Sequence, residues 1–218
     1  HNMRSSRIIR SRTAALGLIV AAAVGLVGLY APVFVTPRNL LALLTDTALL
    51  AMLVLAQMVV LLARSIDLSI ASNLALTGMV AAIVAHNTAL PLASIIVLSA
   101  VIGLGLGLVN GVFVAVLGIP SIVVTLGTLA IFRGVIFFIF GNVWLPSDYM
   151  PEAFRAFPYA TPLGIPNLLV FAIFVAVAMW FFLNHSRTGR AIYAIGGNPV
   201  AAQYCGISMS RIQFLVFA

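Results

Sequence analysis

The residues that could do chemistry in this sequence are hydroxyls, amides and a few charged groups that interrupt long apolar runs. The densest set is the segment A-R-S-I-D-L-S-I-A-S-N at residues 63–73. Polar groups at membrane depth are unfavourable in lipid and usually face a cavity or the interior of a helix bundle. Scattered donors and acceptors of this kind suit hydrogen bonding to a neutral solute rich in hydroxyls, which does not require a dense cluster of charges.

Two structures remain open for this segment. Arg64 and Asp67 are three residues apart, so they could form an ion pair on one helical face. The segment is then either a broken helix that lines a translocation path, as in other transporters, or a turn at the membrane surface with an ordinary ion pair.

A second set of polar residues lies further along the chain. Thr125 and Thr128 share one face of an expected helix that begins at Pro120, because proline has a fixed φ and no N–H to lose there. Arg133 falls inside the same apolar run, where a charge is unfavourable by about 3 kcal/mol. It either snorkels toward water or lines the path. The candidate path residues are Arg64, Asp67, Ser69, Ser72, Asn73, Asn110, Thr125, Thr128 and Arg133.

Several kinds of active site are excluded by motifs that the sequence lacks. It contains no lysine, so a Walker A phosphate-binding lysine is impossible. His86 and His185 have no partner at the four-residue spacing of a helical zinc site, and no serine stands in a G-x-S-x-G turn. We therefore expect no catalytic residue, no metal ion and no cofactor.

Composition places the chain in a membrane. It is 63% hydrophobic and only 7% charged, with a mean hydropathy of +1.22, whereas a soluble domain carries roughly a quarter charged residues. The net charge of +7 comes from 11 arginines. These arginines flank apolar runs, so they indicate topology and not a nucleic-acid partner.

The apolar runs predict an all-α, polytopic transmembrane helix bundle, a single domain over residues 1–218. A run of about 20 residues spans the hydrocarbon core. Six complete spans and the start of a seventh near Ile212 are expected, at residues 13–30, 40–62, 66–85, 91–109, 120–140 and 166–183. Because the chain stops inside an apolar run, we expect further helices beyond residue 218.

Orientation follows from the arginines. With residues 1–12 in the cytoplasm, the outer segments carry only Arg38 and Arg155, as the positive-inside rule demands. Residues 141–165 then form an outer loop and residues 184–211 a cytoplasmic loop. The inner segments carry Arg4, Arg7, Arg10, Arg12, Arg64, Arg187, Arg190 and Arg211.

The cytoplasmic loop is shaped to dock on another protein. Residues 191–210 are almost free of charge and contain glycine and asparagine turns. Ala201–Tyr204 could form a short helix after Pro199, with Asn198 as its N-cap and Gly206 as its end. A short stiff helix of this kind could transmit the motion of a partner as a rigid body.

Three stretches resemble the permease subunits of bacterial ribose-type sugar importers. R-S-I-D-L-S-I-A-S-N-L-A-L-T-G-M (64–79) is similar to the family's G-G-I-D-L-S-V-G-S signature, although Arg64-Ser65 replaces Gly-Gly and Ala71 replaces Gly. V-N-G-V-F-V-A-V-L-G-I-P-S-I-V-V-T-L-G-T-L-A-I-F-R-G (109–134) and T-G-R-A-I-Y-A-I-G-G-N-P-V-A-A-Q-Y-C-G-I (188–207) resemble two more. The variant in the first stretch and P-E-A-F-R-A-F-P (151–158) look most like the rhamnose branch.

The resemblance implies the permease of an ATP-driven (ABC) importer of rhamnose or a related sugar such as ribose, working by alternating access in the bacterial inner membrane. It implies about ten spans, no enzymatic activity in this chain, and a periplasmic loop at 141–165. The implied partners are cytoplasmic ATPase subunits, a second permease subunit in a homo- or heterodimer, a periplasmic sugar-binding protein and membrane lipid. By the same resemblance, coupling to the ATPase falls to Gly189, Arg190, Gly196, Gly197, Asn198, Ala201, Ala202 and Gly206.

An ion-coupled secondary carrier of a small polar solute is the alternative. It would need buried carboxylates on several helices, and Asp46 and Asp67 are the only candidates. Such a carrier would not retain an ATPase on purification, whereas an ABC permease would.

Overall fold

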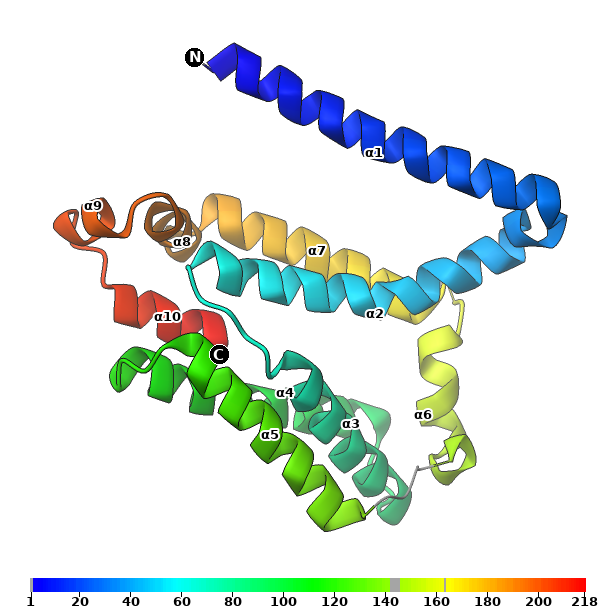
Figure 1. The fold of residues 1–218 in the computed structure, drawn as a ribbon. Coiled ribbons are helices and arrows are strands. Elements are labelled where there is room, and N and C mark those ends of the chain that lie inside the picture. The colour runs from blue at the N-terminus through cyan, green and yellow to red at the C-terminus, as the bar shows by residue number, and fades with distance from the viewer. Residues whose placement is uncertain (1, 142–145, 163) are drawn as a thin grey trace. The chain divides into compact units, whose positions relative to one another are not determined.

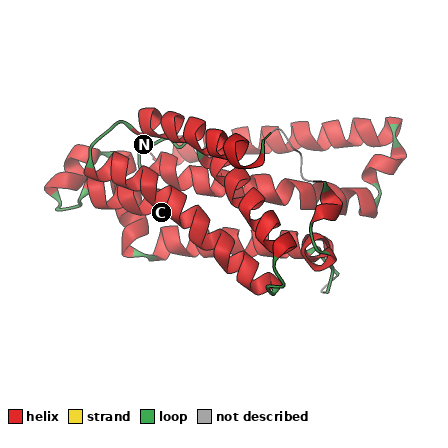
Figure 2. Ribbon diagram, turned by 90° about the horizontal axis from the view of Figure 1, so that it is seen from below, coloured by secondary structure: helices red, strands yellow, loops and turns green. Residues whose placement is uncertain are grey.

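The described residues form helices and loops. The computed structural model describes residues 2–141, 146–162 and 164–218, with no strand among them (Figures 1 and 2). This confirms the all-α class. The chain divides into two units, His1–Thr47 and Ala48–Ala218.

The first unit contains one long helix and a tight turn. α1 (Asn2–Tyr30) includes the apolar stretch Ala14–Tyr30, which corresponds to the first expected span. The 3-10 turn Pro32–Val35 follows, and α2 (Pro37–Leu62) begins at a proline and continues into the second unit. Residue 1 and the side chains of the four N-terminal arginines, which set the expected orientation, lie outside the described residues.

Within the described residues, five helical segments are long and apolar enough to cross a membrane. They match five of the expected spans in order. Their bounds are Pro37–Leu62, Ile70–Asn87, Leu92–Val116, Ser121–Phe140 and Asn167–His185.

Three helices of the second unit pack together: α3 (Ile70–Asn87), α4 (Leu92–Gly111) and α5 (Ser121–Phe140), seen side by side in Figure 1. A π-helical turn, Val112–Val116, extends α4. The expected span at 66–85 is wrong at its start, because the helix begins only at Ile70.

Five further α-helices of this unit follow in the described part of the chain. The glycines of α4 allow one of them, α10, to approach closely, since a Cβ on Gly107 would collide with the carbonyl of Phe217. The bounds are α6 (Glu152–Ala156), α7 (Asn167–His185), α8 (Arg187–Gly197), α9 (Pro199–Tyr204) and α10 (Met209–Phe217).

The described part of the expected outer loop packs on the ends of α3 and α4. The ring of His86 stacks on that of Tyr149, with 3.7 Å between centroids. Phe154 of α6 packs against a buried cluster that includes Ala85 and Ile95. Residues 142–145 and 163, including Trp144, lie outside the described residues.

Candidate functional site

α2 ends in a turn where an arginine takes a left-handed conformation. The N–H of Ser65 donates to the carbonyl of Val60 at 3.1 Å, and the N–H of Arg64 donates to that of Leu61 at 3.0 Å. These two bonds form a Schellman motif, whose left-handed residue is usually glycine. Arg64 has a φ of 57°, which costs a residue with a Cβ about 1–2 kcal/mol. Residues Ala63–Ser69, which we call the connector, lead from this turn to α3.

The Arg64 guanidinium lies against the C-terminal end of α8. Its Nε donates to the carbonyl of Gly196 at 3.2 Å and its Nη2 to that of Gly197 at 3.4 Å. A cation is favourable there because the last carbonyls of a helix carry partial negative charge. The possible ion pair with Asp67 is not formed. The Asp67 carboxylate instead accepts from the N–H and the hydroxyl of Ser69, at 2.7 and 2.6 Å.

Four of the predicted path residues form a buried chain of hydrogen bonds. The hydroxyl of Thr128 donates to the side-chain oxygen of Asn110 at 2.8 Å, and the Asn110 amide donates to the Ser69 hydroxyl at 2.8 Å. The Ser69 hydroxyl in turn donates to Asp67. Asn110 and Ser69 have 0% of their surface exposed. This chain, which we call the polar network, joins the connector to α4 and α5.

The connector backbone is also held by α5 and α10. The Ile66 N–H donates to the Ser121 hydroxyl at 3.1 Å, and the Thr125 hydroxyl donates to the Ile66 carbonyl at 3.3 Å. The Gln213 amide donates to the Ser65 hydroxyl at 3.3 Å. Of these side chains, Ser121 and Gln213 were not predicted. Nothing in the local sequence marks them, because their partners lie 55 and 148 residues away.

The remaining predicted path residues lie around the polar network. The Ser72 hydroxyl donates to the Ser69 carbonyl, and the Asn73 amide donates to the Gly103 carbonyl, which ties α3 to α4. Arg133 is exposed on α5 and is not brought into the network.

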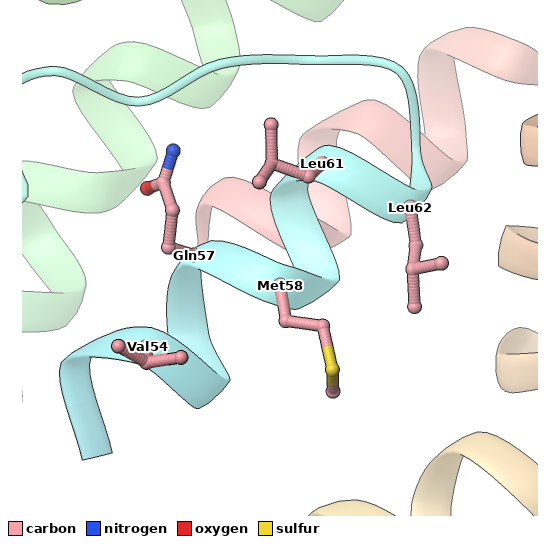
Figure 3. A pocket seen from close by; sticks show the side chains of 5 residues that line it. All are labelled: Val54, Gln57, Met58, Leu61 and Leu62. Atoms are coloured by element: carbon pink, nitrogen blue, oxygen red, sulfur yellow. The ribbon is translucent and has the colours of Figure 1, made fainter. Parts of the chain in front are cut away.

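α2 contributes one further polar group to this unit. A groove of about 330 Å³ lies along α2 between Val54 and Leu62, and it is mainly apolar. Gln57 extends from the helix on the side away from Met58 (Figure 3). Among the described residues, the buried side-chain oxygen of Gln57 has no hydrogen-bond partner.

The first part of the predicted coupling loop is helix α8, held tightly against the end of α7. Ser186 ends α7 and caps α8, since its hydroxyl accepts from the Gly189 N–H at 2.8 Å. A Cβ on Gly189 would collide with the carbonyls of Phe182 and Leu183. Glycine at this position therefore permits the close approach of two helix backbones.

The other end of α8 lies against the end of α2. A Cβ on Gly196 would lie 2.5 Å from the Leu62 carbonyl, whereas one on Gly197 would meet nothing within 4 Å. The inner face of α8 belongs to a buried apolar cluster to which α2, α7, α8, α9 and α10 all contribute. Its members are Val59, Ala63, Leu183, Ile192, Ile195, Ala202 and Ile212.

The short helix expected in this loop is confirmed, with its caps. α9 begins at Pro199, and the Asn198 side chain accepts from the Ala201 N–H at 3.0 Å. Gly206 ends it with a φ of 79°. The bonds from the Gly206 and Ile207 N–H groups back into α9 complete a second Schellman motif.

The outer surface of α8 and α9 carries exposed apolar and aromatic side chains. Tyr193 and Val200 are largely exposed, and Tyr204 is 89% exposed. Arg190 is exposed and donates to the His185 carbonyl at the end of α7, at 3.3 Å.

Sequence reasoning missed α8, because residues 184–197 were taken as loop with glycine turns. The signal that could have found it is the capping serine at 186 followed by Ile192 and Ile195, which are three residues apart on one helical face.

Comparison with known proteins agrees with these features. Residues 39–218 match the family described as "Branched-chain amino acid transport system / permease component". The chain belongs to this family. It is 32% identical over 199 residues to the ribose import permease protein RbsC of Escherichia coli K12, an alignment that covers 89% of this chain and 61% of that protein.

Two further relatives transport different solutes according to their names. The D-allose transport system permease protein AlsC of Escherichia coli K12 is 33% identical over 205 residues, which cover 91% of this chain and 61% of that protein. The autoinducer 2 import system permease protein LsrC of Enterobacter sp. strain 638 is 28% identical over 211 residues, covering 96% and 60%. No solved structure matches the chain.

The chain thus spans about 60% of the length of these relatives. With five candidate spans among its described residues and membership of a permease family, it is a multi-pass membrane protein.

Proposed function

We propose that this chain is the permease subunit of an ATP-driven importer of a monosaccharide in a bacterial inner membrane. The observation that carries the proposal is the capped helix pair α8–α9, anchored on the ends of α2, α7 and α10 while it presents exposed apolar side chains. A loop that only connects two membrane spans would not need a buried apolar cluster of this kind beneath it. The names of the ribose and allose relatives support the substrate class.

In this proposal, α8 and α9 receive the movement of a separate ATPase subunit. The exposed Tyr193, Val200 and Tyr204 form the contact, and the buried Ile192 and Ile195 fix the helices to the bundle. Packed helix pairs move as rigid bodies because cores do not deform continuously. Closure of the ATPase would then rotate the ends of the attached helices and expose the sugar path alternately to each side. ATP hydrolysis belongs to that separate subunit.

The path for the sugar is proposed to run beside the polar network. In the conformation described here, the hydroxyls of Ser69 and Thr128 and the amide of Asn110 are bonded to one another. The groups left to meet a sugar are the exposed Arg133 and the half-buried Gln57, whose side-chain oxygen has no partner among the described residues. Rhamnose is the proposed sugar, with ribose as the related alternative. A binding protein outside the membrane and a second permease subunit complete the assembly.

The first prediction concerns the energy source. We expect uptake of labelled rhamnose by vesicles that contain the complete permease, its ATPase and its binding protein to require internal ATP and to survive a protonophore. Uptake of ribose in place of rhamnose would keep the function and change the sugar. Uptake that follows an ion gradient without ATP would overturn the proposal in favour of a secondary carrier.

The second prediction tests the docking surface. Ala201 is exposed on α9. Ala201→Arg therefore places a long charged side chain in the proposed contact with the ATPase and leaves the buried apolar cluster under α8 and α9 unchanged. We expect co-purification of the ATPase to fall at least about tenfold, since an unpaired charge in an interface costs several kcal/mol.

The matched control is Ala156→Arg, the same change at an exposed position of α6 in the outer loop. It should leave co-purification unchanged. Equal retention of the ATPase by both variants would place the docking surface elsewhere.

A further inference from the structure

Arg64 occupies a backbone position that does not suit it. It is the left-handed residue of the Schellman turn that ends α2, with a φ of 57°. The equivalent residue at the end of α9 is Gly206, at a φ of 79°, where the absence of a Cβ removes the steric cost. Among the described non-glycine residues, Arg64 alone has a positive φ. A strained residue persists only where surrounding contacts hold it in place. For Arg64, those contacts are made by the side chain.

The side chain of Arg64 makes these contacts with the end of α8. The guanidinium bonds the carbonyls of Gly196 and Gly197 at the end of α8, 132 and 133 residues away in the sequence. Glycine at position 196 lets the Leu62 carbonyl come close to the same turn. The arginine therefore joins the end of α2 to the end of α8 with two charge-assisted hydrogen bonds.

The connector is attached to α4 and α5 by residues that follow Arg64. Ile66 is bonded through its N–H to Ser121 and through its carbonyl to Thr125, both on α5. Asp67 and Ser69 lead into the polar network on α4 and α5. A displacement of the C-terminal turn of α8 thus reaches α4 and α5 through a segment of seven residues.

We propose that Arg64 is a positioning residue that ties α8 and α9 to the connector, so that movement of these helices displaces the proposed sugar path. This inference rests on the proposed function for its consequence in transport, but the mechanical link itself is independent of the sugar and of the ATPase. Arg64 fixes the end of α8 relative to the end of α2. When α8 moves, the connector transfers that movement to α4 and α5.

The test uses Arg64→Gly in the complete permease. Glycine suits the left-handed position, so the turn at the end of α2 should form at least as well as before. Only the guanidinium contacts are lost. Arg64→Lys is the conservative variant, which keeps a cation that reaches the same carbonyls. Arg211→Gln removes an exposed cytoplasmic charge whose guanidinium takes no part in the link, and it serves as the control for net charge.

The first readout is the mobility of a spin label on Cys205, the only cysteine of residues 1–218, which is exposed directly after α9; any cysteine outside these residues is replaced by serine in every variant. It is measured in vesicles without the ATPase. Arg64→Gly should raise the mobile fraction severalfold, Arg64→Lys should restore most of the immobilised signal, and Arg211→Gln should match the unchanged protein. An Arg64→Gly spectrum identical to that of the unchanged protein would overturn the link.

The second readout is the number of ATP molecules hydrolysed per sugar imported by the assembled transporter. Arg64→Gly should raise this ratio severalfold, while the ATPase still co-purifies. If Arg64→Gly made the spin label on Cys205 more mobile but left the ratio of ATP hydrolysed to sugar imported unchanged, the proposed role of Arg64 in transport would be overturned. Failure of the unchanged permease to retain any ATPase would refute the proposed function instead, and the label experiment would still decide the link.

Discussion

Gly189→Ala is expected to displace α8 and to lower sugar uptake at least about tenfold. The new Cβ would collide with the carbonyls of Phe182 and Leu183 at the end of α7, and backbone atoms cannot rotate away as a side chain can. Overpacking of this kind costs about 1–3 kcal/mol, and the strain falls on the turn that the Ser186 cap holds. Uptake in vesicles and the thermal midpoint of the detergent-solubilised protein both measure the effect.

Gly197→Ala is the matched control at the other end of the same helix. A Cβ there meets nothing within 4 Å, and the residue is exposed with an ordinary φ. Its effect on stability should stay within about 0.5 kcal/mol, as for most surface substitutions. If the two alanine variants behaved alike, the close packing of α8 on α7 would be contradicted.

Asn110→Leu is expected to have the second largest effect, because it removes the centre of the polar network. Asn110 has 0% of its surface exposed, bonds to Ser69 and accepts from Thr128. Leucine has a similar shape but no hydrogen-bonding group, so both hydroxyls lose a partner. Interhelical hydrogen bonds in membrane proteins contribute about 0.6 kcal/mol on average and up to about 1.7, which predicts a combined loss of about 1–3 kcal/mol.

A double-mutant cycle isolates the contact between α4 and α5. Thr128→Val removes the hydroxyl that donates to Asn110, so the two changes together should cost less than their sum by about 0.6–1.7 kcal/mol. Ser99→Ala is the control on the same helix, since its hydroxyl bonds back to the Ile95 carbonyl. It should be additive with Asn110→Leu. Additivity of Thr128→Val as well would show that the hydrogen bond between Thr128 and Asn110 contributes nothing to stability.

Whatever depends on neighbouring residues was predictable from the sequence. Five spans were predicted because an apolar run of about 20 residues is by itself long enough and apolar enough to cross a membrane. α9 and its caps were predicted because Asn198, Pro199 and Gly206 act within one or two turns of backbone. The resemblance in three ordered motifs led to the same family as the comparison of residues 39–218.

The partners of the polar residues were decided only by the tertiary structure. Arg64 and Asp67 are close in sequence and could have paired, yet Arg64 reaches the end of α8 and Asp67 accepts hydrogen bonds from Ser69, just before α3. Helix spacing could not predict this, because the helix ends at Leu62 and the connector is not helical.

The sequence by itself determined that this chain is an all-α membrane protein with a short capped helix at residues 199–204, since composition, apolar length and caps are local properties. Only the tertiary structure decided that Ser69, Asn110 and Thr128 share one buried network and that Arg64 meets Gly196. Those bonds join residues 18 to 132 positions apart. Their geometry exists only after the helices have packed, because each donor bonds to an acceptor that packing places within hydrogen-bonding distance.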